Sequence, residues 1–70
     1  MDIRKMTCII IRRNGEFLVG RDYVNGTLRW SNSAYDAWRT RDREKAREMA
    51  RRTGGVTVLF NHVAGQMKVI

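Results

Sequence analysis

The chain has 70 residues, 43% of them hydrophobic and none of them proline, which excludes a disordered or repetitive protein and predicts a single domain over residues 1–70. Fourteen Lys and Arg against seven Asp and Glu give a formal net charge of +7, which favours polyanions or acidic partners. Its one cysteine, Cys8, excludes an internal disulfide, and one cysteine with one histidine cannot supply a structural zinc site. No apolar run resembles a signal peptide or a membrane span, so we expect a cytoplasmic protein without membrane contact, metal or other cofactor.

The first part of the chain reads as a β-hairpin. Residues 6–12 and 16–20 are two strand-like runs, and Asn14-Gly15 lies between them. Asn-Gly favours a two-residue turn because a type I′ turn requires positive φ at both central positions. The predicted pairs are Arg13/Glu16, Arg12/Phe17, Ile10/Val19 and Cys8/Arg21.

A second Asn-Gly, Asn25-Gly26, predicts another two-residue turn leading to a third strand that ends at Ser31. The pairs that this turn implies are Val24/Thr27, Tyr23/Leu28, Asp22/Arg29 and Arg21/Trp30.

Together the two turns divide the predicted sheet into two faces. The core face collects Met6, Cys8, Ile10, Phe17, Val19, Tyr23, Leu28 and Trp30. The opposite face is polar except for an apolar island of Ile9, Ile11 and Leu18. We expect either that the C-terminal strands shield this island or that it contacts a second copy or another protein.

One helix is predicted over residues 40–53, with Thr40 as N-cap and Gly54 as the left-handed residue that ends it. An apolar stripe at helical spacing should pack on the core face of the sheet, and it consists of Ala46, Met49, Ala50 and Thr53. The outer face carries five cations and two anions.

After the helix, alternation over residues 56–61 predicts a fourth strand beside the first, parallel to it after a right-handed crossover. Residues 62–66 form a loop, and residues 67–70 add a short fifth strand. The predicted fold class is therefore α+β: an antiparallel β-meander with one α-helix packed on one face and a further C-terminal strand or hairpin.

The C-terminal half resembles small β-β-α-β proteins of phages and prophages, in which a tryptophan strand precedes an alanine-spaced helix that ends in Gly-Gly. The residues that carry this resemblance are Trp30, Ala37-Trp38, Ala46, Ala50 and Gly54-Gly55-Val56. Because such proteins are mostly of unknown function, the resemblance implies a mobile-element origin and no activity.

Catalysis is not expected from this sequence. Cys8 falls on the core face, where a thiol is inert filling, and His62 falls in a loop, where a solvent-facing histidine is commoner than a catalytic base. The carboxylates show no spacing typical of a catalytic pair. We expect no enzyme and no catalytic residue.

Two functions remain open. The first is a non-catalytic binding or accessory protein that forms a homodimer, or contacts a host or phage protein, through Ile9, Ile11 and Leu18. The alternative is nucleic-acid binding by the basic outer face of the helix, since clustered cations on a small domain suit a phosphate backbone. The residues predicted for this alternative are Arg41, Lys45, Arg47, Arg51 and Arg52.

Overall fold

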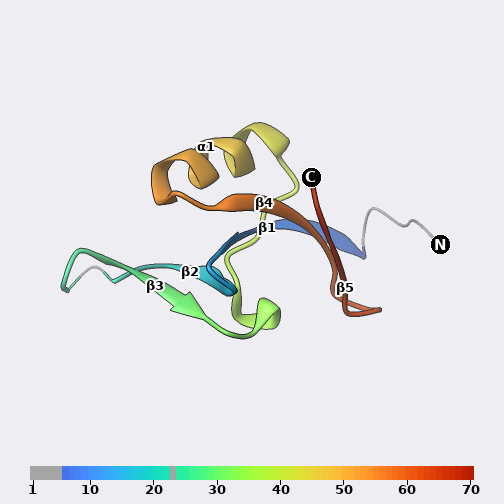
Figure 1. The fold of residues 1–70 in the computed structure, drawn as a ribbon, viewed down its shortest axis with the longest axis horizontal. Helices are drawn as coiled ribbons and strands as arrows, with labels where there is room; N and C mark the ends of the chain where they lie inside the picture. The colour runs from blue at the N-terminus through green and yellow to red at the C-terminus, as the bar shows by residue number, and fades with distance from the viewer. Residues whose placement is uncertain (1–5, 23) are drawn as a thin grey trace.

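The computed structural model describes residues 6–22 and 24–70 and has an α+β fold with a single α-helix in that part of the chain. Its elements are β1 (Thr7–Arg13), β2 (Glu16–Asp22), β3 (Thr27–Ser31), the 3₁₀ turn η2 (Ala34–Asp36), α1 (Arg43–Thr53), β4 (Val56–Asn61) and β5 (Gln66–Val69). The strands form one sheet in the order β3-β2-β1-β4-β5, and every neighbouring pair is antiparallel (Figure 1). The predicted fold class is confirmed.

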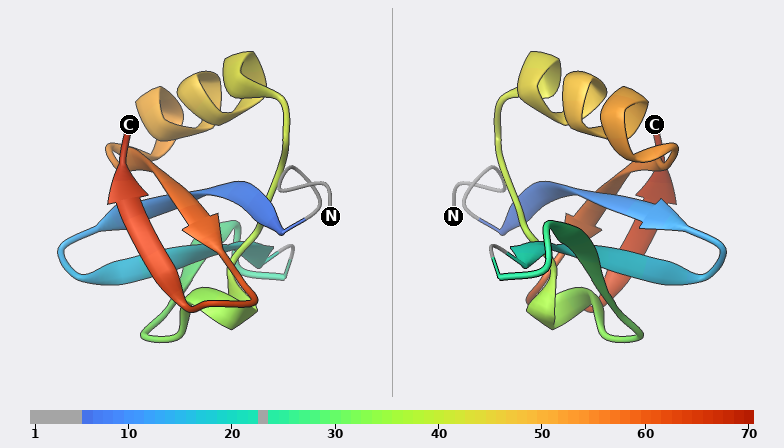
Figure 2. Two further views of the ribbon diagram at one scale, coloured as in Figure 1. Left: turned by 90° about the vertical axis from the view of Figure 1, so that its right-hand side faces the viewer. Right: turned by 90° about the vertical axis from the view of Figure 1, so that its left-hand side faces the viewer.

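The central strand β1 is buried on both faces, which is why its residues are apolar without alternation. The helix lies over one face of the sheet, and the connection containing η2 lies on the other (Figures 1 and 2). The helix-side core contains Ile11, Leu18 and Ala50, with Leu28, Trp30, Trp38 and Met49 packed against it. The opposite core contains Cys8, Ile10, Phe17, Ala34, Ala37, Val58 and Phe60.

This arrangement overturns the prediction of an apolar island on an outer sheet face. Ile9, Ile11 and Leu18 have exposed fractions of 4%, 0% and 1%. They belong to the face that the helix covers, whereas the predicted core face is closed by η2 and its flanks. The prediction failed because it allowed only one covered face.

The first hairpin has the predicted turn and its first two pairs, Arg12↔Phe17 and Arg13↔Glu16. Asn14 and Gly15 have φ of 53° and 79°, as a type I′ turn requires.

Beyond these pairs, β1 and β2 form main-chain hydrogen bonds with residues 38–40. Ile9 donates to the Thr40 carbonyl at 2.7 Å and accepts from the Thr40 amide at 3.0 Å. The Trp38 amide donates to the Leu18 carbonyl at 2.8 Å. The predicted extension of the hairpin through Ile10/Val19 and Cys8/Arg21 is therefore replaced by contacts with this segment.

The second turn is longer than predicted. The Asp22 carboxylate accepts from the Val24 amide at 2.9 Å and from the Asn25 side chain at 3.0 Å, and the Gly26 amide donates to the Asp22 carbonyl at 2.7 Å. These bonds close a four-residue loop, and the hydrogen bond from Val24 lowers the pKa of Asp22. The observed pairs are Asp22↔Thr27, Arg21↔Leu28 and Gly20↔Arg29. The predicted pairs Val24/Thr27, Asp22/Arg29 and Arg21/Trp30 are wrong, and Tyr23/Leu28 involves a residue outside those described.

A register shift between Leu18 and Gly20 then changes which side chains share a face. Trp30 pairs with Leu18 and joins the helix-side core, whereas Phe17 pairs with Ser31 and joins the opposite core. The prediction that Trp30 and Phe17 share one face is wrong. As a result Trp30 lies beneath the guanidinium of Arg13, whose carbon is 4.2 Å from the ring centroid.

Helix α1 begins later than predicted. Its N-cap is Asp42, whose carboxylate accepts from the amides of Glu44 at 3.0 Å and Lys45 at 3.3 Å. Thr40 is instead held in the bridge with Ile9, so it cannot cap the helix. At the other end Gly54 has φ 74°, as predicted, and the buried stripe is Ala46, Ala50 and Thr53.

Strand β4 lies beside β1 as predicted, but it is antiparallel, with Cys8↔Phe60 and Ile10↔Val58 among its pairs. The parallel crossover is wrong because residues 38–40 already run antiparallel to β1, which adds one chain reversal before the helix. The predicted C-terminal hairpin is present, and its pairs run from Asn61↔Gln66 to Val58↔Val69.

The burial of Leu18 predicts a large stability cost for truncation. Leu18→Ala should lower the free energy of unfolding by about 2–5 kcal/mol, because it leaves a cavity under the helix. Val24→Ala is the matched control, since Val24 is 91% exposed, and it should cost less than about 0.5 kcal/mol. Denaturant unfolding followed by circular dichroism measures both values. Equal costs would mean that Leu18 is not part of the core.

Gly55 should be intolerant of a side chain because the chain entering β4 passes close to β1. A Cβ at this position would lie 2.5 Å from Ile11 Cγ2 and 3.0 Å from the Arg12 carbonyl oxygen. Gly55→Ala should therefore cost roughly 1–3 kcal/mol in the same unfolding measurement. Gly54→Asn provides the comparison, because asparagine tolerates the left-handed conformation and should cost less. A Gly55→Ala protein as stable as the parent would contradict the close approach.

Candidate nucleic-acid interface

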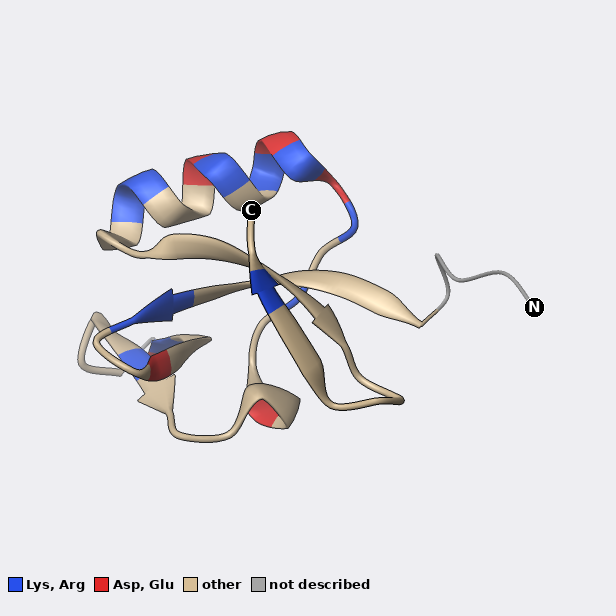
Figure 3. Ribbon diagram, turned by 45° about the vertical axis from the view of Figure 1, so that its right-hand side comes forward, with Lys and Arg blue, Asp and Glu red and all other residues tan. Residues whose placement is uncertain are grey.

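The outer face of α1 carries mixed charge rather than one basic surface. Arg52 pairs with Glu48 at 2.6 Å. Arg47 and Arg51 line a shallow hollow together with Glu44 and Glu48. Acidic and basic residues are interleaved along the helix (Figure 3). The ridge therefore presents carboxylates as well as cations.

The five residues predicted for nucleic acid thus separate into different surroundings. Arg51 and Arg52 lie on the mixed ridge, and helical periodicity puts Lys45 on the same flank as Arg52, away from Arg47. Arg41 faces a different region of the molecule, beside the first half of β1. Arg47 lies between the two regions, because it lines both the crevice beside Ile9 and the ridge hollow with Arg51. Nucleic-acid binding by the outer helix face therefore stays a prediction, for a surface on which Glu44 and Glu48 lie among the cations.

Three adjoining hollows run along the first half of β1, and we name them together the arginine groove. The first is lined by Ile9, Arg43, Ala46, Arg47, Thr57 and Ile70. The second is lined by Thr7, Cys8, Ile9, Arg41, Arg43 and Leu59. The third is lined by Cys8, Arg39, Thr40, Arg41 and His62. Within the described residues, this lining contains four arginines and no Asp or Glu side chain.

Two arginines of the groove, Arg39 and Arg41, belong to the extended segment that precedes the helix. Thr40 is fixed to β1 by its two main-chain bonds with Ile9, so Arg39 and Arg41 on either side of it are held at the third hollow. Arg39 is held further by a bond from its Nη2 to the Tyr35 carbonyl at 2.9 Å. The position of these arginines therefore depends on the β-bridge rather than on helix geometry.

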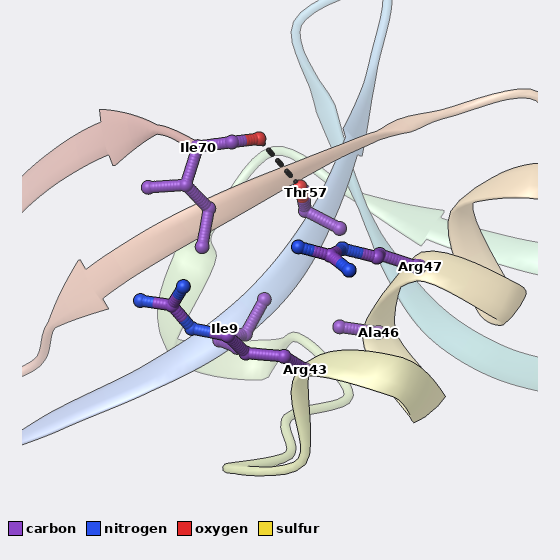
Figure 4. Close-up of a pocket in the computed structure, with 6 residues that line it drawn as sticks. All are labelled: Ile9, Arg43, Ala46, Arg47, Thr57 and Ile70. Carbon is purple, nitrogen blue, oxygen red and sulfur yellow. Dashed lines mark hydrogen bonds between the residues drawn. The ribbon is translucent and has the colours of Figure 1, made fainter.

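The helix supplies the remaining two arginines. Arg43 and Arg47 are one turn apart, and both side chains extend over the crevice between α1 and β4 (Figure 4). Ile9 and Ala46 form the apolar part of this hollow, and the Thr57 hydroxyl donates to the Ile70 carbonyl at 2.8 Å on its far side. Its volume is about 140 Å³.

The third hollow also brings Cys8 and His62 together. The thiol is 5% exposed, and its sulfur lies 3.8 Å from the Phe60 carbonyl to which it donates. Burial raises the pKa of Cys8, although the charges of Arg39 and Arg41 act in the opposite direction. A protonated thiol is a poor nucleophile, so the chemistry of this hollow is that of its cations.

Sequence reasoning missed Arg39 and Arg43, although a signal was present. Residues 39–43 read Arg-Thr-Arg-Asp-Arg, a period-two pattern that places alternate side chains on one side of an extended chain. Beginning the helix at Thr40 concealed this pattern. The predicted protein contacts Ile9, Ile11 and Leu18 are buried and present no surface.

Comparison with known proteins identifies no relative. No family model, curated protein or solved structure matches the chain. Among the described residues, no group of three or more His, Cys, Asp or Glu side chains is placed to hold a metal ion, and no helix is long and apolar enough to cross a membrane.

The environment of Cys8 makes a direct prediction about its reactivity. Because burial raises its pKa, the thiolate fraction at neutral pH is below that of an exposed cysteine and increases only as the pH rises. A disulfide reagent should therefore label the native protein much more slowly than the urea-unfolded protein at pH 7. Labelling followed by mass spectrometry measures both rates. Equally fast labelling in the two states would contradict a buried thiol.

Proposed function

We propose that this protein binds nucleic acid through the arginine groove, by contacts with the phosphate backbone and without catalysis. The observation that carries the proposal is the clustering of cations: the described lining of the groove has Arg39, Arg41, Arg43 and Arg47 but no Asp or Glu side chain. Arg47 stands at its border, since it also lines the ridge hollow with Glu44 and Glu48. Guanidinium groups recognise phosphate oxygens in a bidentate manner, and several phosphate contacts add up to salt-dependent affinity.

Helix electrostatics support the same reading. The positive end of the helix dipole disfavours cations, yet Arg41 and Arg43 flank the N-cap of α1. The carboxylate of Asp42, between them in the chain, accepts hydrogen bonds from the helix amides. Because that carboxylate already occupies the helix amides, a bound phosphate would be held by the guanidinium groups of Arg41 and Arg43 rather than by the helix N-terminus.

The alternative cation sites are weaker candidates. Arg52 has a carboxylate partner, and Arg51 lies among Glu44 and Glu48. A phosphate approaching this ridge would meet acidic side chains as well as basic ones. The groove is therefore preferred over the outer helix face as the contact surface.

The proposal is tested by fluorescence anisotropy with labelled oligonucleotides, single-stranded and duplex, over a range of salt concentrations. Affinity should fall steeply with added salt for the parent protein. Arg43→Gln and Arg47→Gln should each weaken binding and reduce the slope of log affinity against log salt by about 1.

Lys45→Gln and Arg52→Gln are matched controls, since they remove the same charge from the same helix on the flank away from Arg47. They should leave the slope nearly unchanged. Equal effects from both pairs of variants would reject the groove as the interface. Absence of binding at low salt would reject nucleic-acid binding altogether.

A further inference from the structure

We infer that a second copy of this chain pairs with the free edge of β5, so that two sheets join into one across a two-fold axis. This inference is independent of the arginine groove. It rests on the main-chain geometry of β5, on the side chains that flank its edge and on a register in which the strand complements itself.

The main-chain groups of β5 that have no partner within residues 6–22 and 24–70 can be identified from its ladder with β4. The Ile70 amide donates to the Thr57 carbonyl at 3.1 Å, so Ile70 points its polar groups toward β4. Because alternate residues of an antiparallel ladder point in opposite directions, Met67 and Val69 direct their N–H and C=O groups away from β4. These groups form an open edge at the end of the sheet.

The side chains at this edge are also suited to burial. Met67 is 45% exposed and Val69 is 54% exposed, and both lie on the sheet face opposite α1, because they pair with Phe60 and Val58. Val56, 47% exposed, is on the same face of β4. Along the described β5, Gln66 and Lys68 alternate with this apolar pair, so one face of the edge is apolar and the other polar.

A two-fold axis perpendicular to the sheet keeps like faces together and allows a complementary register. In this register Met67 of one copy lies opposite Val69 of the other, and Lys68 lies opposite its equivalent. The outward groups of Met67 and Val69 then form four intermolecular hydrogen bonds, and the two apolar pairs are buried. The other edge of the sheet is less suitable, because β3 lies against the register shift in β2.

Lys68 sets the salt dependence of this contact. Two lysines directly opposite each other repel, so the dimer should be reversible and should tighten when salt screens them. Nucleic-acid binding has the reverse dependence, because salt weakens it. The two activities can thus be separated in one set of buffers.

Sedimentation equilibrium of the full chain without nucleic acid tests the inference. The parent protein should form dimers at high micromolar concentration, more strongly at higher salt. Met67→Lys should raise the dimer dissociation constant by roughly tenfold or more, because it buries an unpaired charge. Lys68→Thr should lower it by roughly threefold, since it removes the repulsion and thus strengthens association. Damage to the fold would not produce such a decrease in the dissociation constant.

Mixed variants test the register. Met67→Lys and Val69→Glu should each associate poorly alone, whereas an equimolar mixture should recover dimers, because residue 67 of one copy then meets the opposite charge at residue 69 of the other. Circular dichroism verifies that each variant is folded. A parent protein that stays monomeric at every salt concentration would overturn the inference, and so would a mixture without recovery or a Met67→Lys dimer as strong as the parent. None of these results bears on oligonucleotide binding.

Discussion

The fold depends on the burial of β1 on both of its faces. A strand whose consecutive residues Cys8 to Ile11 are nearly inaccessible must be covered twice, and a 70-residue chain has few elements with which to do so. The helix covers one face, and the connection through η2 covers the other. Residues 38–40 complete the enclosure by bonding to β1 and β2 where these strands part. The arginines at residues 39 and 41 are carried to β1 by this same enclosure.

The register shift in β2 decides how the helix-side core is filled. Because it turns Trp30 toward α1, the large ring supplies volume that the small stripe of Ala46 and Ala50 cannot supply. Arg13 then stacks on this ring and donates to the Thr53 carbonyl at 2.8 Å, which satisfies an acceptor near the end of the helix. One irregularity in a strand thereby couples the sheet, the helix terminus and an exposed cation.

Local signals in the sequence were sufficient for the parts of the fold that local chemistry determines. Asn14-Gly15, the helix stripe, Gly54 and the alternation of β4 were all predicted correctly. The signals failed where another interaction competed with them. The Asp22 carboxylate stabilises a longer loop than Asn25-Gly26 alone implies. Main-chain hydrogen bonds with Ile9 hold Thr40 outside the helix. For the candidate site, Arg41 and Arg47 were predicted. Arg39 depended on a bridge that pairs residues far apart in the chain, and Arg43 on the later start of the helix.

The acidic side chains differ from the groove arginines in their structural roles. Asp42 caps the helix, Glu48 pairs with Arg52, and Asp22 closes a turn, so each of these acids has a structural role. The arginines at the N-terminal end of α1 have the opposite character, because their charge opposes the helix dipole. Their side chains line hollows whose apolar part includes Ile9. The placement of these arginines therefore follows from the path of the chain into α1, and the proposed binding of an anionic ligand would give their charge a use that the fold does not require.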